Sequence, residues 1–203
     1  MGNVLKTLLI TANECDYLEE NTLSKIGGHI SFIKKSGIEN VIFHVNILNA
    51  IGDEKRNRLT LFLKTEIDKT FGKTATIVDN YTDIEKTGTA DASVYFVLGL
   101  GGRSELKTIL SKMIRESQNQ NQALDAEKMT ADEVQKFISG NLILPMEPDL
   151  VLSCHEETLT DFMIWQTIYS EYVFIKKSLN DLTTADLEKA FTDFKNRQRR
   201  YGV

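Results

Sequence analysis

Cysteine and proline are both scarce in this sequence. Its 203 residues include two cysteines and two prolines. Cys15 and Cys154 lie far apart and fit no zinc-binding spacing, and so few cysteines are typical of a reducing cytosol. The sequence has no proline-rich linker, no internal repeat and no break in composition. We therefore expect a single domain over residues 1–203.

Long apolar runs and a surplus of positive charge are also missing. The apolar stretch near the N-terminus is broken too early for a signal peptide or a transmembrane helix. The formal net charge of −5 is unlike that of a nucleic-acid-binding protein. These absences predict a cytoplasmic protein with no transmembrane anchor and no nucleic-acid partner.

Short β-type runs alternate with longer helical patterns along the chain. Strands are predicted at residues 4–11, 41–45, 75–78, 94–98 and 150–152. Helices are predicted at about 23–33, 53–72, 106–114, 130–138, 159–173 and 183–194, and a polar surface loop at 117–128. The alternation predicts an α/β fold with an open, mostly parallel sheet flanked by helices. Ligands of such sheets bind beyond the carboxyl ends of the strands.

Helix starts carry recognisable signals. Thr130 with Glu133 and Thr183 with Asp186 have the spacing of capping boxes, and Asp53 is a candidate N-cap.

Two glycine-containing segments have two interpretations each. Gly27 and Gly28 lie inside a predicted helix, where they indicate either tight helix–sheet packing or close approach of a ligand, with His29 facing the cleft. Residues 99–103, which include two adjacent glycines and Arg103, end a strand and open a helix. Their backbone could hold an anion, or they could form a plain strand–helix turn.

A metal or redox site is conceivable at the same edge of the sheet. Cys154 and His155 follow one predicted strand, and Cys15 follows another, with His29 in the next helix. Single ligands from separate loops rarely converge by chance, so we do not favour this interpretation.

An aromatic cluster near the C-terminal end also has two interpretations. Its members are Phe162, Trp165, Tyr169, Tyr172 and Phe174. Core packing explains such residues in general, but these occupy more than one face of the predicted helix. Some of them should therefore be exposed or buried against another chain.

The C-terminal third carries a family resemblance. From Pro148 it reads PDLVLSCHEETLTDFMIWQTIYSEYVF, and later NRQRRYG. This pattern resembles the C-terminal part of undecaprenyl and dehydrodolichyl diphosphate synthases, the cis-prenyltransferases. The residues in register are Phe162, Trp165, Gln166, Tyr169, Glu171 and Phe174. Scattered matches elsewhere are Gly28-His29, Asn49, Gly101-Gly102-Arg103 and Glu105.

The departures from the family pattern concern its catalytic residues. Active members carry M-D-G-N-x-R after the first strand, and the aspartate is taken to organise Mg²⁺ on the diphosphates. Here Thr11 stands in place of that aspartate, Asn13 is kept, and Cys15 replaces the arginine. A threonine hydroxyl cannot supply the anionic oxygen that a hard dication needs.

A second family loop, R-T-G-G-E-x-R, is also altered. Ser153 and Thr158 replace its two arginines, although Glu156 keeps the glutamate. Without the two guanidinium groups, bidentate binding of a diphosphate is lost.

The resemblance therefore implies a non-catalytic subunit of a heteromeric cis-prenyltransferase, of the Nogo-B receptor type. In the family the aromatic segment forms a dimer interface, which here comprises Phe162, Trp165, Tyr169, Glu171 and Phe174. The R-x-G motif, here Arg200 and Gly202, reaches the partner's isopentenyl diphosphate. Mg²⁺ is then expected in the partner's active site, with no cofactor on this chain alone.

Two other functions remain open from the sequence. One is a self-sufficient homodimeric polyprenyl diphosphate synthase, and the other is a non-enzymatic isoprenoid-diphosphate binder. For the subunit we expect a cytoplasmic location, with peripheral attachment to the membrane where the product is released as a further possibility.

Overall fold

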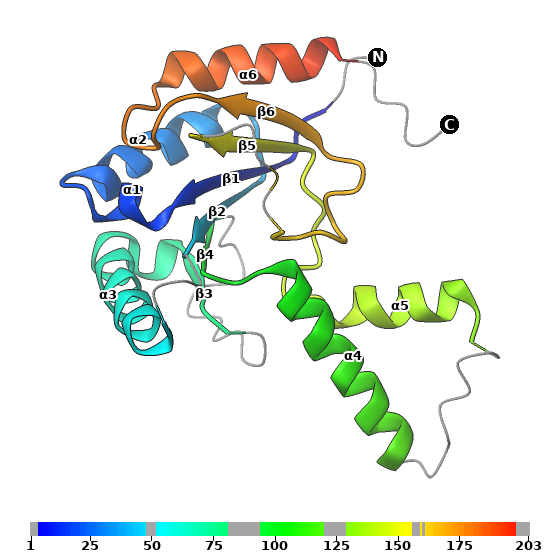
Figure 1. The fold of residues 1–203 in the computed structure, drawn as a ribbon. Coiled ribbons are helices and arrows are strands. Elements are labelled where there is room, and N and C mark those ends of the chain that lie inside the picture. Colours follow the sequence, from blue (N-terminus) through cyan, green and yellow to red (C-terminus); the bar gives the residue numbers. More distant parts are fainter. Residues whose placement is uncertain are drawn as a thin grey trace.

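The structure is a computed structural model that describes residues 4–47, 52–80, 94–119, 129–155, 159 and 161–197. Its strands are β1 (Thr7–Asn13), β2 (Asn40–Asn46), β3 (Thr76–Val78), β4 (Val94–Leu98), β5 (Leu150–Cys154) and β6 (Glu171–Ile175) (Figure 1). Its helices are α1 (Glu14–Leu18), α2 (Thr22–Lys35), α3 (Asp53–Phe71), the 3-10 turn η2 (Gly72–Thr74), α4 (Gly102–Asn119), α5 (Ala131–Asn141) and α6 (Thr184–Asn196).

All six strands pair in parallel, in the order β3-β4-β2-β1-β5-β6. β1 lies inside the sheet between β2 and β5. Its side chains alternate between the two faces, since Leu8 and Ile10 belong to one apolar cluster and Leu9 to the other. The predicted open, parallel α/β sheet is confirmed.

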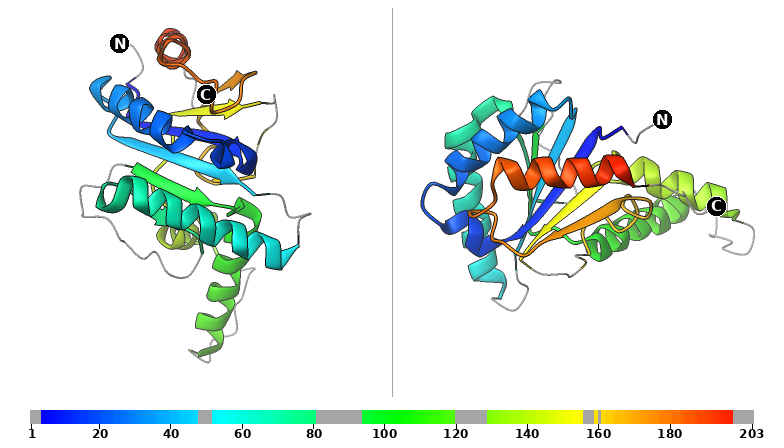
Figure 2. Two further views of the ribbon diagram at one scale, coloured as in Figure 1. Left: turned by 90° about the vertical axis from the view of Figure 1, so that its left-hand side faces the viewer. Right: turned by 90° about the horizontal axis from the view of Figure 1, so that it is seen from above.

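Apolar side chains of helices pack on one face of the sheet, and apolar side chains of loops and turns pack on the other. Ile26 of α2, Leu63 of α3 and Phe191 of α6 belong to the cluster on one face. Phe32 of α2 stacks on Phe191, with 6.2 Å between the ring centroids. On the other face, Ile143 packs with residues of the turns after β5. The helices α4 and α5 extend from the sheet on the side opposite α6 (Figures 1 and 2).

Aromatic rings fill the layer under α3. Phe43 of β2 stacks on Phe96 of β4, and Phe71 at the end of α3 packs on Phe96 as well. Both pairs have ring centroids 5.1 Å apart, and Phe43 and Phe96 are 0% exposed. This part of the interior is packed with side chains from three elements.

The helix predicted at about 159–173 is wrong. Residues 161–169 form turns instead, in which the N–H groups of Gln166 and Thr167 both donate to the carbonyl of Met163. Met163 itself has a left-handed φ of 53°. The chain then enters β6, which pairs with β5. A β-branched and aromatic run next to an open strand edge favours a strand over a helix, because the pairing satisfies both backbones.

Both predicted capping boxes are confirmed. The hydroxyls of Thr130 and Thr183 accept from the N–H groups of Glu133 and Asp186. The prediction of Asp53 as an N-cap is wrong, because Gly52 is the N-cap of α3 and Asp53 is its first residue. The predicted surface loop at 117–128 is wrong for its first three residues, because α4 continues to residue 119. Residues 120–128 lie outside the described residues.

Candidate functional site

The candidate site lies at the carboxyl edge of β1, β2 and β5, where Thr11 and His44 are paired across neighbouring strands. Thr11 Oγ1 lies 3.2 Å from His44 Nδ1, and His44 Nε2 lies 2.9 Å from the carbonyl oxygen of Leu100. Because a carbonyl only accepts, Nε2 carries the ring proton and Nδ1 accepts from the Thr11 hydroxyl. The Thr11 hydroxyl therefore donates its proton to a hydrogen bond with His44.

His44 is a neutral, buried histidine. Burial lowers the pKa of its imidazole to about 4, although the Leu100 carbonyl favours the charged form. Its ring stacks on Phe162, with centroids 4.1 Å apart. Sequence reasoning missed His44, and the only signal was a histidine inside the apolar run of a strand. Thr11 and His44 thus present no charge where the family pattern has a carboxylate.

A prediction about acid stability follows from this burial. Since the folded pKa of His44 lies below the usual value of 6.5, the unfolded chain binds more protons between about pH 6.5 and pH 4. Stability contributed by the neutral ring is complete above pH 6.5 and is lost as the pH falls toward 4. The loss is on the order of 3 kcal/mol.

Urea unfolding at pH 7, 6 and 5 would measure this loss. The His44→Gln variant keeps a polar group that does not titrate, so its free energy of unfolding should fall less steeply over the same range. If the free energy of unfolding falls equally steeply with pH in the variant and the unmodified protein, His44 is not the group responsible.

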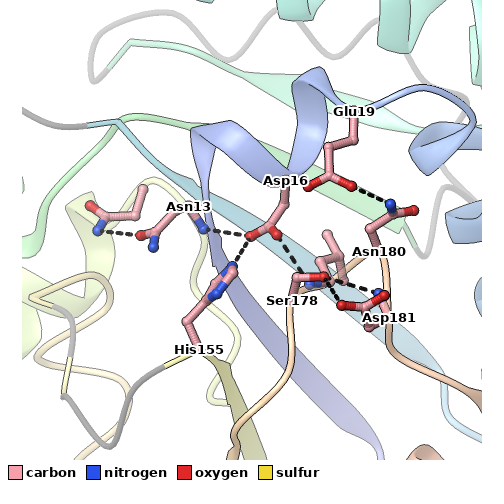
Figure 3. Close-up of polar contacts among 9 residues, drawn as sticks. Asn13, Asp16, Glu19, His155, Ser178, Asn180 and Asp181 are labelled. Atoms are coloured by element: carbon pink, nitrogen blue, oxygen red, sulfur yellow. Dashed lines mark hydrogen bonds and ion pairs between the residues drawn. The ribbon is translucent and has the colours of Figure 1, made fainter.

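Asp16 of α1 joins three loops at this edge (Figure 3). Its Oδ2 accepts from His155 Nε2 at 2.6 Å and from the N–H of Asn13 at 3.2 Å. Its Oδ1 accepts from the N–H of Leu179 at 3.3 Å. The residue is 1% exposed, so its carboxylate is enclosed by protein donors. Glu14, the other acidic residue that follows β1 directly, is also buried.

The loop between β6 and α6 is tied to the same edge by a second set of contacts (Figure 3). The Asn180 amide donates to Glu19, and Lys25 Nζ donates to the Asn180 side-chain oxygen at 2.8 Å. The N–H of His155 donates to the Lys177 carbonyl at 3.0 Å, and His155 adopts a left-handed φ of 72°. Sequence spacing could not reveal the two contacts of Asn180, because they join residues more than a hundred positions apart.

The cysteines and Ser153 occupy different environments. Ser153 is buried and pairs with Thr11 across β1 and β5. Burial raises the pKa of the Cys154 thiol to about 12, and the nearby Asp16 carboxylate adds to the effect. Cys154 is therefore a poor nucleophile and a poor metal ligand at neutral pH. Cys15 is exposed, and both cysteines are free thiols.

His29 lies in α2, near the loop between β6 and α6. It is buried in α2 with its ring toward Leu182, and burial lowers the pKa of its imidazole. The neighbouring glycines are not required for tight packing. A Cβ on Gly28 would meet nothing within 4 Å, and one on Gly27 would make an ordinary contact with Phe71.

The glycine segment before α4 forms a strand–helix turn against the loop after β5. The N–H of Gly102 donates to the Asp161 carbonyl at 2.7 Å, and a Cβ on Gly102 would lie 2.2 Å from that oxygen. Close packing therefore requires Gly102, and its N–H is not available to an anion. Arg103, the basic residue of the segment that could hold an anion, is exposed on the first turn of α4.

A polar pocket of about 480 Å³ opens beside this turn, one strand away from Thr11. Asp53, Arg56 and Asp161 line it together with Asn46 and Ser104. The Arg56 guanidinium donates to the Gly99 carbonyl. Arg56 and Asp161 were not singled out from the sequence, and Asp53 was considered only as an N-cap, because α3 and the turn that contains Asp161 are far apart in the chain.

The predicted interface residues divide between core and surface. Phe162 is 3% exposed and belongs to the core of this chain. Trp165 is partly exposed. Tyr169 and Phe174 are exposed, and so is Ile168, which precedes Tyr169 in the chain. The Glu171 carboxylate binds Arg197, the C-cap residue after α6, with 3.0 Å between the nitrogen and oxygen atoms. β6 is the last strand of the sheet, and within the described part of the chain its outer side pairs with no strand.

Five predicted site residues lie outside the described residues, namely Asn49, Glu156, Thr158, Arg200 and Gly202. Nothing in the structure bears on their proposed roles.

A six-stranded parallel sheet flanked by helices defines an α/β protein, and comparison with known proteins identifies the family. A family model described as "Putative undecaprenyl diphosphate synthase" matches residues 38–202. The chain belongs to the cis-prenyltransferase (undecaprenyl diphosphate synthase) family. In the part of the chain that the structure describes, no helix combines the length and apolarity needed to cross a membrane.

Individual relatives are similar over part of their length. The ditrans,polycis-undecaprenyl-diphosphate synthase of Lactiplantibacillus plantarum, described as specific for (2E,6E)-farnesyl diphosphate, is 33% identical over 109 residues. An isoprenyl transferase of Enterococcus faecalis is 34% identical over 115 residues. Each match covers 53% of this chain, and 41% and 40% of those proteins respectively.

Two solved structures share the fold. A probable undecaprenyl diphosphate synthase from Campylobacter jejuni has a TM-score of 0.72 at 17% identity, over 99% of this chain and 100% of that one. Lavandulyl diphosphate synthase from Lavandula x intermedia, solved with dimethylallyl diphosphate, has a TM-score of 0.73 at 15% identity, over 98% of both chains.

Proposed function

We propose that this chain is the accessory, non-catalytic subunit of a heteromeric cis-prenyltransferase. The complex would make a long-chain polyprenyl diphosphate from isopentenyl diphosphate and an allylic diphosphate. The observation that carries the proposal is the neutral Thr11–His44 pair at the end of β1, where the family pattern has an aspartate. Transfer of a diphosphate leaving group needs preorganised charge, and this position supplies none.

Thr11 and Asp16 at this edge do not fit Mg²⁺. The ion prefers octahedral oxygen ligands that include one or two carboxylates. The Thr11 hydroxyl donates to His44, and the Asp16 carboxylate is enclosed by Asn13, His155 and Leu179. Binding a metal through Asp16 would break three hydrogen bonds that hold separate loops together. The proposal therefore places the metal on the partner subunit.

The packed interior supports the same assignment. A growing isoprenoid chain needs a long apolar channel, and the layer under α3 is filled by the stacked rings of Phe43, Phe96 and Phe71. Channel space in this layer would require those rings to move apart. We therefore assign the product-binding channel to the partner as well.

The exposed aromatic residues at β6 support a two-chain assembly. Tyr169 and Phe174 are exposed near this last strand of the sheet, where the Tyr172 carbonyl accepts from Arg197 at 2.8 Å. Large aromatic side chains are enriched at protein interfaces. A catalytic cis-prenyltransferase subunit is the partner that we propose for this surface.

The decisive experiment is incorporation of labelled isopentenyl diphosphate onto farnesyl diphosphate with Mg²⁺. It compares this protein alone, a catalytic homologue from the same cell alone, and the mixture. The proposal expects no turnover by this protein alone and strong activation in the mixture. Turnover by this protein alone would overturn it.

Replacing Trp165 with alanine tests the interface. We expect the affinity for the catalytic partner to fall at least tenfold, since a partly buried tryptophan often anchors an interface. Titration by calorimetry or light scattering would measure the change. Leu61→Ala, an exposed site on α3, is the control and should leave the affinity unchanged. Equal affinities for both variants would place Trp165 outside the interface.

A self-sufficient homodimeric synthase is the second candidate. It is favoured by the synthase and transferase activities after which the relatives are named, and by the polar pocket that contains Asp53 and Asp161. If the purified protein turns over alone, Asp53→Asn and Asp161→Asn should each abolish that activity. The third candidate, a non-enzymatic binder, would show tight diphosphate binding with no effect on a partner's turnover.

A further inference from the structure

The last helix, α6, lies alongside β6 and runs in the opposite direction (Figures 1 and 2). Polar contacts join the two elements at both ends of the helix. Near the start of α6, Lys177 Nζ donates to both carboxylate oxygens of Asp186 at 2.8 Å. At the other end, Arg197 contacts the first two residues of β6. This second set of contacts lies where the chain leaves the helix.

The guanidinium of Arg197 bonds to both elements at once. Its Nη1 donates to Glu171 Oε2 at 3.0 Å and to the Tyr172 carbonyl oxygen at 2.8 Å, both on β6. Its Nε donates to Asp193 Oδ2 of α6 at 3.1 Å. The planar fork of an arginine holds several acceptors in a fixed arrangement, whereas the ammonium group of a lysine is a single point charge. The side chain therefore fixes the end of α6 against the start of β6.

The backbone at Arg197 is held as well. Arg197 is the C-cap of α6, with an extended ψ of 146°, and its N–H donates to the Phe194 carbonyl at 3.2 Å. Phe194 is 0% exposed and belongs to the core. The chain thus turns out of the helix at a residue that is fixed through both its backbone and its side chain.

The charge of Arg197 is compensated within the chain. Its guanidinium forms ion pairs with the carboxylates of Glu171 and Asp193. Binding a diphosphate through Arg197 would require these charge-assisted hydrogen bonds to break. The contacts of Arg197 therefore indicate that it holds the chain in place rather than binding an anion itself.

The position of Arg197 limits where Arg200 can lie. Arg200 is three positions further along the sequence, and three residues of fully extended chain span at most about 11 Å. A segment that begins at a fixed point has fewer conformations to lose on binding than one that begins at a frayed helix end. Fixing Arg197 therefore lowers the entropic cost of placing Arg200.

We propose that Arg197 is a positioning residue, which anchors the C-terminal segment to the start of β6 so that Arg200 meets the partner's isopentenyl diphosphate. This role of Arg197 rests on the proposed accessory function. Without the anchor, only a fraction of the molecules present Arg200 correctly, and the apparent affinity for isopentenyl diphosphate falls by that fraction. Saturating substrate restores the correct arrangement, so KM changes more than kcat.

A double-mutant cycle in the mixture of this chain with its catalytic partner tests the proposal. Arg197→Gln should raise the KM for isopentenyl diphosphate about tenfold and change kcat less than about twofold. In the Arg200→Ala background the same substitution should change either constant less than about twofold, because no guanidinium remains to be positioned. A role of Arg197 in stability alone would lower the activity by the same factor in both backgrounds. Equal factors would overturn the proposal.

Arg58→Gln is the matched control. Arg58 pairs with Glu54 on the exposed surface of α3, at the same i,i+4 spacing as Arg197 and Asp193. The control should keep the KM for isopentenyl diphosphate within about twofold of that of the unmodified complex. Sedimentation of the mixture should show the same assembly for both variants. An equal rise in KM for both variants, or loss of assembly in Arg197→Gln, would also contradict the positioning role.

The anchor can be measured in the chain alone. Arg197→Gln should speed amide hydrogen exchange several-fold at position 197 and at Phe194, while exchange at Leu187, near the start of α6, stays unchanged. Unchanged exchange at the end of the helix would overturn the proposal. Failure of the unmodified chain to activate its partner would overturn the accessory function and, with it, this role of Arg197. Normal activation with equal factors in the two backgrounds would overturn only the role of Arg197.

Discussion

Replacing Arg200 with alanine is expected to lower the turnover of the mixed complex about a hundredfold while leaving its assembly intact. The family resemblance assigns Arg200 and Gly202 to the partner's isopentenyl diphosphate. Loss of one positioned donor from a developing charge typically costs that much. Initial rates of labelled isopentenyl diphosphate incorporation would measure the loss, and sedimentation of the mixture would report assembly.

Lys195→Ala provides the matched control for Arg200→Ala. Lys195 is an exposed cation in the last turn of α6, so its loss lowers the positive charge near the C-terminus equally. Its rate should stay within about twofold of the unmodified complex. If Arg200→Ala abolishes assembly, or if both variants lose the same activity, the in-trans role of Arg200 is contradicted.

Replacing Phe96 with alanine should lower the free energy of unfolding by about 4 kcal/mol. Phe96 is fully buried and contacts the rings of both Phe43 and Phe71, so its removal leaves a cavity between β4, β2 and α3. Chemical denaturation of the purified chain measures the change. The variant also opens space in the layer that the accessory-subunit proposal regards as closed.

Phe62→Ala removes the same side chain from an exposed position on α3. The free energy of unfolding should change by less than about 0.5 kcal/mol. A small effect of Phe96→Ala would mean that the layer is loosely packed. The packing argument against a product channel in this chain would then be lost.

Local patterns were sufficient to predict most of the fold. Five strands and both capping boxes were found from the sequence, because apolar runs and the Thr-x-x-acid spacing depend on neighbouring residues alone. β6 was missed because its run of large residues fits either a helix or a strand. The pairing with β5 decides between them, and pairing is a long-range property.

The candidate site was only partly predictable for the same reason. The sequence identified Thr11 and Ser153, and the structure pairs them across adjacent strands. It did not identify His44 as the partner of Thr11, or the Asp16–His155 pair, since neither follows from spacing in the chain. Phe162 was assigned to an interface, whereas its ring stacks on His44 in the core.

The position of β1 within the sheet constrains the order in which the chain can fold. β1 pairs on one side with β2, which follows soon after it, and on the other side with β5. The N–H groups of Lys6 and Thr7 both donate to Asp149, which lies more than 140 positions later. Contacts at such separation form slowly, because a long loop must close first. During synthesis the N-terminal half can assemble early, but one side of β1 stays unpaired until β5 leaves the ribosome. Through that interval the nascent chain exposes an apolar strand edge of the kind that chaperones protect from aggregation.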